Sequence, residues 1–186
     1  MLWFYHTHIP VIMTRISWNP QFAIDYLRLL RYYSLGNYKD LVKAICIDNA
    51  MLIHLDGYLN IKSAPQENFG REFLELFTVG KGPEVSLGDY TNFTEQDVKA
   101  LTKVLTGWGI DTTFQTVDPI TGIPTGQVNT DNNGNATQHD VTGKQFSPAF
   151  NNQTIQTPNV VNWTCSSASV HTELSAAVDM VFSSVN

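Results

Sequence analysis

Apolar residues recur every three or four positions through most of residues 1–107, and this helical periodicity most constrains the fold of the chain. Pro, Gly and Asn residues separate the periodic stretches, as they do at helix ends. The pattern predicts helices over 21–34, 38–55 and 66–79, and a fourth from Thr94 to Gly107. Four amphipathic helices joined by short turns indicate a mainly α protein, folded as a helical bundle.

The fourth of these helices carries the clearest start signal. Thr94-Glu95-Gln96-Asp97 matches a capping box, in which a hydroxyl and a carboxylate each accept a hydrogen bond from a backbone N–H group that the helix leaves unpaired. Apolar residues follow it at helical spacing. The sequence therefore predicts a helix that begins directly after Thr94.

Residues 108–165 have a different character. They are rich in Asn, Thr and Gly, and the run 129–135 is composed of turn-forming residues. We expect a long irregular excursion with short strands at 112–117 and 139–146. Helical spacing returns over 166–186, where the apolar residues are Leu174, Val178, Val181, Phe182 and Val185. This last helix is expected to pack on the bundle, within one domain fragment whose two ends both look cut.

Charge divides the chain in the same way. Residues 1–104 hold ten Lys and Arg against eleven acids, whereas residues 105–186 hold Lys144 as their one Lys or Arg against six acids. An acidic chain without a basic stripe argues against a nucleic-acid partner. No apolar run approaches the roughly 20 residues that span a bilayer. Cys46 and Cys165 are too few for a disulfide framework.

Several ordered blocks resemble one known family. They are Trp3-Phe4-Tyr5-His6-Thr7-His8, Asn68-Phe69-Gly70-Arg71-Glu72-Phe73-Leu74-Glu75-Leu76-Phe77-Thr78-Val79-Gly80, Asp89-Tyr90-Thr91-Asn92-Phe93-Thr94-Glu95-Gln96-Asp97-Val98, Leu105-Thr106-Gly107-Trp108, and His139-Asp140 followed by Gly143-Lys144-Gln145-Phe146. In the residues, order and spacing of these blocks, the chain resembles the bacterial family called domain of unknown function eighteen-hundred. The family usually has Ala where this chain has Gly70, and Gly costs about 1 kcal/mol relative to Ala inside a helix.

The resemblance implies a longer parent protein, with the rest of its own chain as a partner, and no established activity. Genes of this family often lie beside genes for a sulfatase-like protein in bacteria that export many proteins. That context implies a periplasmic, cell-surface or secreted location and a sulfatase-like partner.

His6 and His8 are the first candidate site residues, as metal ligands. Two imidazoles at i, i+2 lie on one side of a strand but about 200° apart on a helix. A divalent transition metal would need further ligands, which His139 and Asp140, or Glu72 and Glu75, can supply. The alternative is that these histidines are hydrogen-bonded core residues.

The second candidate group is the polar face of the predicted 66–79 helix. Arg71, Glu72 and Glu75 lie on it at helical spacing. If this face is buried against His6 and His8, Arg71 can hold one carboxylate while the other transfers protons. If it is solvated, Arg71 forms ordinary pairs with Glu67 and Glu75, each worth about 0.3–0.5 kcal/mol.

A weaker candidate is a calcium loop at Asn129, Asp131, Asn133 and Gly134, with Asp140 at the twelfth position. The first position is Asn and the twelfth is not Glu, so Asn/Gly turns without an ion are the simpler interpretation.

Two hypotheses about function follow. The first is a metal-assisted enzyme, hydrolytic or oxidative, located in the envelope or secreted. The second is a non-catalytic envelope or assembly protein whose polar blocks form buried structural networks.

Overall fold

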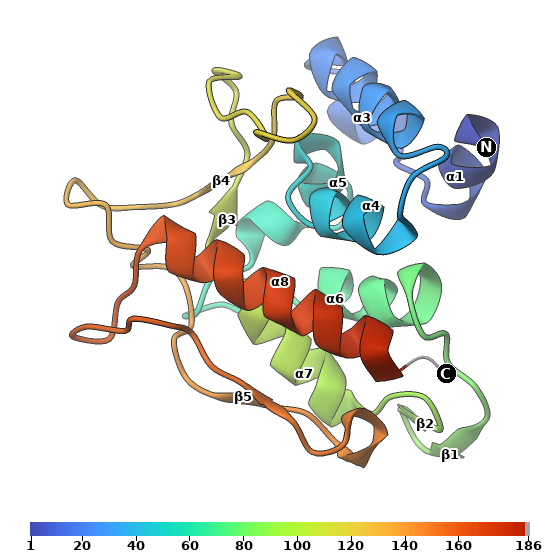
Figure 1. Cartoon of the computed structure of the whole chain (residues 1–186), viewed down its shortest axis with the longest axis vertical. Coiled ribbons are helices and arrows are strands. Elements are labelled where there is room, and N and C mark those ends of the chain that lie inside the picture. Colours follow the sequence, from blue (N-terminus) through green and yellow to red (C-terminus); the bar gives the residue numbers. More distant parts are fainter. Residues whose placement is uncertain (185–186) are drawn as a thin grey trace.

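The chain is mainly α, with short antiparallel strand pairs before the last helix, as the periodicity predicts (Figure 1). This is a computed structural model, and it describes residues 1–184. The α-helices are α1 (Leu2–His8), α2 (Met13–Ile16), α3 (Pro20–Tyr32), α4 (Tyr38–Ile45), α5 (Asn49–His54), α6 (Asn68–Glu72), α7 (Glu95–Val104) and α8 (Ser167–Ser184). Short 3₁₀ turns η1 (Gly57–Leu59) and η3 (Pro148–Phe150) and a π-helical segment η2 (Phe73–Phe77) accompany them.

The strands are two or three residues long and pair as antiparallel ribbons. They are β1 (Glu84–Ser86) with β2 (Asp89–Tyr90), β3 (Trp108–Gly109) with β4 (Gln127–Val128), and β5 (Lys144–Gln145) with β6 (Thr154–Ile155). None of the helices among residues 1–184 combines the length and apolar character that crossing a bilayer requires.

Side-chain caps fix where several helices begin. The amides of Asn19 and Asn37 accept hydrogen bonds from the first turns of α3 and α4, and the carboxylate of Asp48 does the same for α5. The predicted capping box at the start of α7 is confirmed. The side chain of Thr94 accepts a hydrogen bond from the backbone N–H of Asp97, and the side chain of Asp97 accepts one from the backbone N–H of Thr94.

Two predicted helices differ from the structure. The predicted helix over 38–55 is divided, because the chain turns at Cys46 and Asp48 caps a new helix. The predicted helix over 66–79 begins at Asn68 and widens at Phe73 into the π-helical segment η2. Such π segments are rare and are often found at functional sites.

The prediction of a strand at 112–117 was wrong. Asp111 accepts backbone hydrogen bonds from Thr113 and Thr116, which closes this segment into turns. The strand predicted at 139–146 shrinks to β5. Val185, counted in the predicted last helix, lies outside the described residues.

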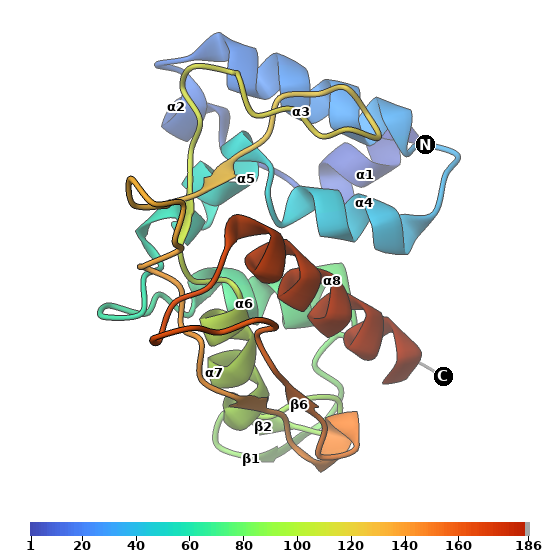
Figure 2. The ribbon, with the colours of Figure 1, turned by 60° about the vertical axis from the view of Figure 1, so that its left-hand side comes forward.

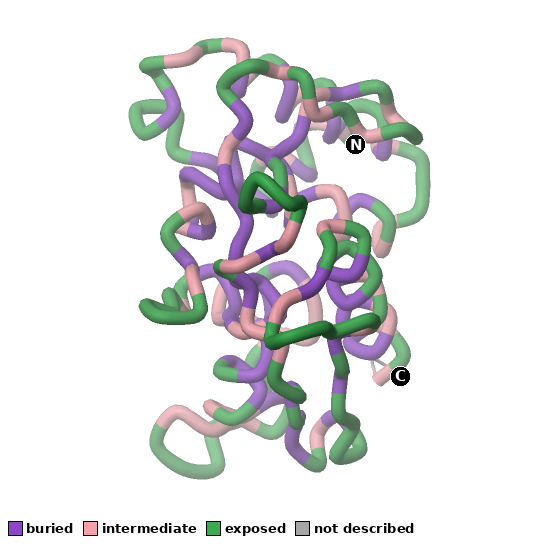
Figure 3. Tube along the Cα trace, turned by 90° about the vertical axis from the view of Figure 1, so that its left-hand side faces the viewer, coloured by how far each residue is buried: buried purple, intermediate pink, exposed green. Residues whose placement is uncertain are grey.

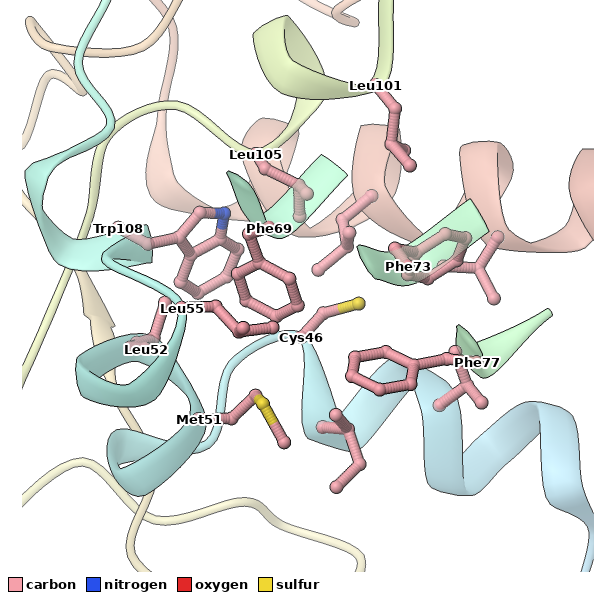
Figure 4. Close-up of a cluster of buried hydrophobic side chains, with 14 of the residues drawn as sticks. Cys46, Met51, Leu52, Leu55, Phe69, Phe73, Phe77, Leu101, Leu105 and Trp108 are labelled. Carbon is pink, nitrogen blue, oxygen red and sulfur yellow. The ribbon is translucent and has the colours of Figure 1, made fainter. Parts of the chain in front are cut away.

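The core lies between the first helices and the α6–α7–α8 layer (Figures 2 and 3). Phe69, Phe73 and Phe77 project from α6 and η2 toward α4, α5 and α7, and Trp108 closes one side of the cluster (Figure 4). The last helix, α8, packs on α4 and α7, and η3 and β6 also contact it. The segment after β3 passes over α3 (Figure 2), where the Tyr32 hydroxyl donates a hydrogen bond to the Ile120 carbonyl.

The packing explains why Gly70 suits this chain. A Cβ atom at Gly70 would lie 2.9 Å from the Thr102 hydroxyl oxygen and 3.2 Å from the Val98 carbonyl oxygen. Helices α6 and α7 therefore approach too closely at this point for an Ala side chain. The sequence suggested a weakened helix, whereas the structure shows a close helix–helix contact.

Candidate functional site

The histidines of the first motif lie on helix α1, so the side chains of His6 and His8 point in different directions. His6 contacts the ring of Trp3, and His8 stacks on Phe4 with 5.7 Å between ring centroids. The two imidazoles do not form a shared ligand pair in this helix.

Arg71 forms one of its two predicted ion pairs and a closer one that the sequence did not predict. Arg71 binds Glu95 through two parallel hydrogen bonds of 2.6 and 3.0 Å and lies 3.6 Å from Glu67. This fork lowers the pKa of Glu95. The expected Glu67–Arg71 pair is therefore present, whereas Glu75 pairs with Lys81 at 3.0 Å instead of with Arg71.

Glu72 is the carboxylate of this motif that no ion pair or hydrogen bond holds among the described residues. Burial raises its pKa, and the neighbouring charge of Glu75 raises it further. A proton-transfer group works best with a pKa near the operating pH, and a raised carboxyl pKa is a change in that direction. Of the two carboxylates in this motif, Glu75 forms an ion pair and Glu72 forms none among the described residues.

Tyr38 joins the first motif to the second. Its ring stacks on Tyr5 of α1 at 5.9 Å, and its hydroxyl donates a 2.8 Å hydrogen bond to the Phe77 carbonyl at the end of η2. The π-helical end is therefore linked to α1 through an aromatic side chain of α4, and not through a metal-ligand pair.

His139 forms the centre of a second polar cluster, and its ring is completely buried. Nδ1 lies 2.8 Å from the Thr106 carbonyl oxygen and Nε2 lies 3.0 Å from Glu173 Oε2. The Thr106 hydroxyl oxygen also lies 3.2 Å from Nδ1, so both ring nitrogens of His139 are held by polar partners from other segments of the chain.

Lys144 occupies the other side of the same carboxylate. Its ammonium nitrogen lies 2.6 Å from Glu173 Oε1 and also donates to the Thr157 hydroxyl at 3.0 Å and to the Asp140 carbonyl oxygen. Thr157 in turn donates to Glu173 Oε2. The ammonium group therefore makes two hydrogen bonds and one close ion pair, and Glu173 Oε1 has no hydrogen-bond partner among the described residues.

Asp140 lies beside this cluster, but its carboxylate binds Thr142 and not the members of the cluster. Its backbone N–H donates to the Thr106 hydroxyl, while its side chain accepts two hydrogen bonds from Thr142. Burial opposes ionisation of Asp140, but the hydrogen bonds from Thr142 and the charges of Lys103 and Lys144 together lower the pKa of its carboxyl.

The predicted site residues thus lie in separate environments: His6 and His8 on α1, Arg71, Glu72 and Glu75 at α6–η2, and His139 with Asp140 beside α8. Among residues 1–184 no three His, Cys, Asp or Glu side chains are grouped so that they could hold a metal ion. At the candidate calcium loop, Asp131 accepts hydrogen bonds from the backbone of Asn133 and Asn135 and closes a turn.

Sequence reasoning did not identify Glu173 as a functional residue, although a signal was present. Glu173 lies three residues after Val170 and four before Ala177, on the apolar face of α8. A lone acid on a buried face needs a cation, and Lys144 is the one Lys or Arg of residues 105–186.

The comparison with protein families agrees with the motif blocks. Residues 1–186 match the model of a family described as "Protein of unknown function (DUF1800)", so the chain belongs to this family. No curated protein and no solved structure matches the chain.

Proposed function

We propose that this region is a non-catalytic structural module of an exported or cell-envelope protein. Its polar motif residues stabilise the fold and join distant segments of the chain. The observation that carries the proposal is the cluster of His139, Lys144 and Glu173, in which each residue is at most 1% exposed and is bonded to other residues of the chain.

The connectivity of this cluster supports a structural role. Thr106 lies after α7, His139 and Lys144 belong to the excursion, and Glu173 belongs to α8. One carboxylate thus holds the irregular segment against two helices. The site is closed to solvent, and a buried charge removed from such a network leaves its partner uncompensated at a cost of about 3–5 kcal/mol.

A second candidate is a metal-assisted enzyme, hydrolytic or oxidative, with Glu72 or Glu75 as the proton-transfer group and His6, His8, His139 and Asp140 as possible metal ligands. The specific observation in its favour is Glu72, a half-buried carboxylate with a raised pKa and no ion-pair partner among residues 1–184. Arg71 would orient the neighbouring carboxylates. For this candidate to bind a metal, the proposed ligands on α1 and those beside α8 would have to lie closer together than they do in the structure.

Elemental analysis of the purified protein separates the two candidates. We expect the wild type and the His6→Ala/His8→Ala variant to contain the same substoichiometric amount of transition metal. The matched control is His54→Ala, because His54 lies outside the predicted ligand set. One equivalent of metal that is lost in His6→Ala/His8→Ala but retained in His54→Ala would overturn the structural proposal.

The location and partners rest on family context. The gene neighbourhood supports an envelope or secreted location, a sulfatase-like partner, and contacts with the rest of a longer chain. Fractionation of cells with an antibody against the protein tests the location: recovery in the cytoplasm alone would contradict it.

A further inference from the structure

A pocket of about 430 Å³ opens where the excursion folds over α3, α4 and α8. This volume suits a small ligand, since ligand sites commonly measure about 300–1,000 Å³. The aromatic rings of Tyr32 and Tyr33 form one wall, and Ala44, Ile47 and Leu174 supply apolar surface. None of the motif residues discussed above lines it.

Residues that line the pocket are held in place by their own contacts with the rest of the fold. The Tyr32 hydroxyl donates to the Ile120 carbonyl and ties the excursion to α3. On the opposite side the ring of His171 lies edge-on to the buried indole of Trp108, with 4.8 Å between ring centroids. The walls therefore come from elements with their own contacts to the fold.

The polar groups of the pocket are mostly acidic. Asp40 and Asp118 both line it, and the side chain of Tyr33, a residue only 7% exposed, projects into it. The Tyr33 hydroxyl makes no hydrogen bond within residues 1–184. Tyr33, Asp40 and Asp118 line the same pocket, and burial, followed by the charges of Asp118 and Asp40, raises the pKa of Tyr33.

The two basic groups at the pocket do not neutralise these acids. Lys43 donates 2.8 Å hydrogen bonds to Asp179 and Ser175, and Asp179 also pairs with Lys39, so Lys43 can offset at most one of the two lining carboxylates. Burial lowers the pKa of His171 despite the opposing charge of Asp118, which favours the neutral imidazole. The lining therefore presents negative charge beside aromatic faces.

We propose that this pocket binds a small organic cation, an ammonium group carried on a compact apolar or aromatic body. The ammonium would lie between Asp40 and Asp118 and donate hydrogen bonds to the two carboxylates and to the Tyr33 hydroxyl oxygen. The tyrosine rings would contribute cation–π attraction, and the apolar floor would cover the body of the ligand.

Calorimetric titration with phenethylamine tests the proposal, with phenethyl alcohol as the neutral isostere. We expect the amine to bind at least about tenfold more tightly than the alcohol, because only the amine gains charge-assisted contacts. The double variant Asp40→Asn/Asp118→Asn is expected to lose this preference. At position 118 the amide oxygen can still accept from the Ile120 N–H, whereas the NH₂ group replaces the oxygen that accepts from the Thr121 hydroxyl.

The matched control is Glu84→Gln on the exposed β1–β2 hairpin, which removes a carboxylate far from the pocket lining and should leave amine binding unchanged. Tyr33→Phe provides a milder second variant and should weaken amine binding without affecting the alcohol. Absence of amine binding, equal binding of amine and alcohol, or unchanged preference in a folded Asp40→Asn/Asp118→Asn protein would each overturn the proposal.

Discussion

Lys144 Nζ lies 2.6 Å from Glu173 Oε1, and both side chains are completely buried where the excursion meets α8. The two residues come from segments that differ in composition and in secondary structure. Their ion pair, completed by His139 and Thr157, is the polar centre of an otherwise apolar contact. This relationship makes the stability of the fold depend on one carboxylate.

Lys144→Met should lower the free energy of unfolding by about 3–5 kcal/mol, because it leaves the Glu173 carboxylate buried without its cation. Lys144→Met/Glu173→Met should recover much of this loss, since two apolar side chains need no partner. Urea unfolding followed by circular dichroism measures both. The control is Lys103→Met, which breaks a 3.9 Å pair between a solvent-exposed lysine and Asp140 and should cost less than about 1 kcal/mol. Equal losses in Lys144→Met and Lys103→Met would contradict the structural role of the network.

Asp48 should make stability fall as the pH rises. Burial raises its pKa from 3.8 to about 7, so the folded state holds this proton more tightly than the unfolded state. Its contribution is full below about pH 3.8 and is lost by about pH 7, with a slope of about 1.4 kcal/mol per pH unit. Asp48→Asn should remove this slope and keep the helix cap, because an amide oxygen can also accept the Met51 N–H. Parallel pH curves for the two proteins, from denaturant unfolding, would show that Asp48 does not titrate in this way.

Gly70→Ala should destabilise the protein by about 1–3 kcal/mol, although Ala is the better helix former. The added methyl group would press on the Thr102 hydroxyl, 2.9 Å from the new Cβ atom. The hydroxyl of Thr102 is buried and has no hydrogen-bond partner among the described residues, so Thr102→Ala removes the obstruction without breaking a bond. In a double-mutant cycle, Gly70→Ala should cost clearly less in the Thr102→Ala background. Additive effects would argue against a direct contact between α6 and α7 at this point.

Tyr38→Phe should lower the free energy of unfolding by about 1–2 kcal/mol, because it removes the hydrogen bond to the Phe77 carbonyl at the end of η2. Tyr58→Phe is the matched control, since the Tyr58 hydroxyl makes no hydrogen bond within residues 1–184, and we expect almost no change. Thermal unfolding of the three proteins provides the comparison. If the free energy of unfolding falls no more in Tyr38→Phe than in Tyr58→Phe, the Tyr38 hydroxyl does not stabilise the contact between α4 and η2.

The sequence predicted those parts of the fold that depend on neighbours along the chain. The capping box of Thr94 and Asp97, the apolar face of α7 and the turn-rich excursion all follow from interactions over a few residues. The family was also identified from ordered motif blocks, because a family match depends on residue identity and spacing alone.

The choice of polar partners was decided only by the tertiary structure. Arg71 has Glu67 and Glu75 at helical spacing, yet its closest bonds are with Glu95 of α7. Lys144 and His139 meet at Glu173, which lies more than one helix turn into α8. In each case several acids were equally suitable by charge, and the packing of helices determined which of them came within bonding distance.

The same reason explains the limits of the sequence at the candidate sites. Local spacing states which side chains share a face, so it established that His6 and His8 would diverge if their segment formed a helix. It does not state which distant face they meet, whether Glu72 is buried, or that Asp40 and Asp118 line one pocket beside Tyr33. Those relationships depend on how the apolar core packs, because burial of that core brings segments far apart in sequence to fixed positions.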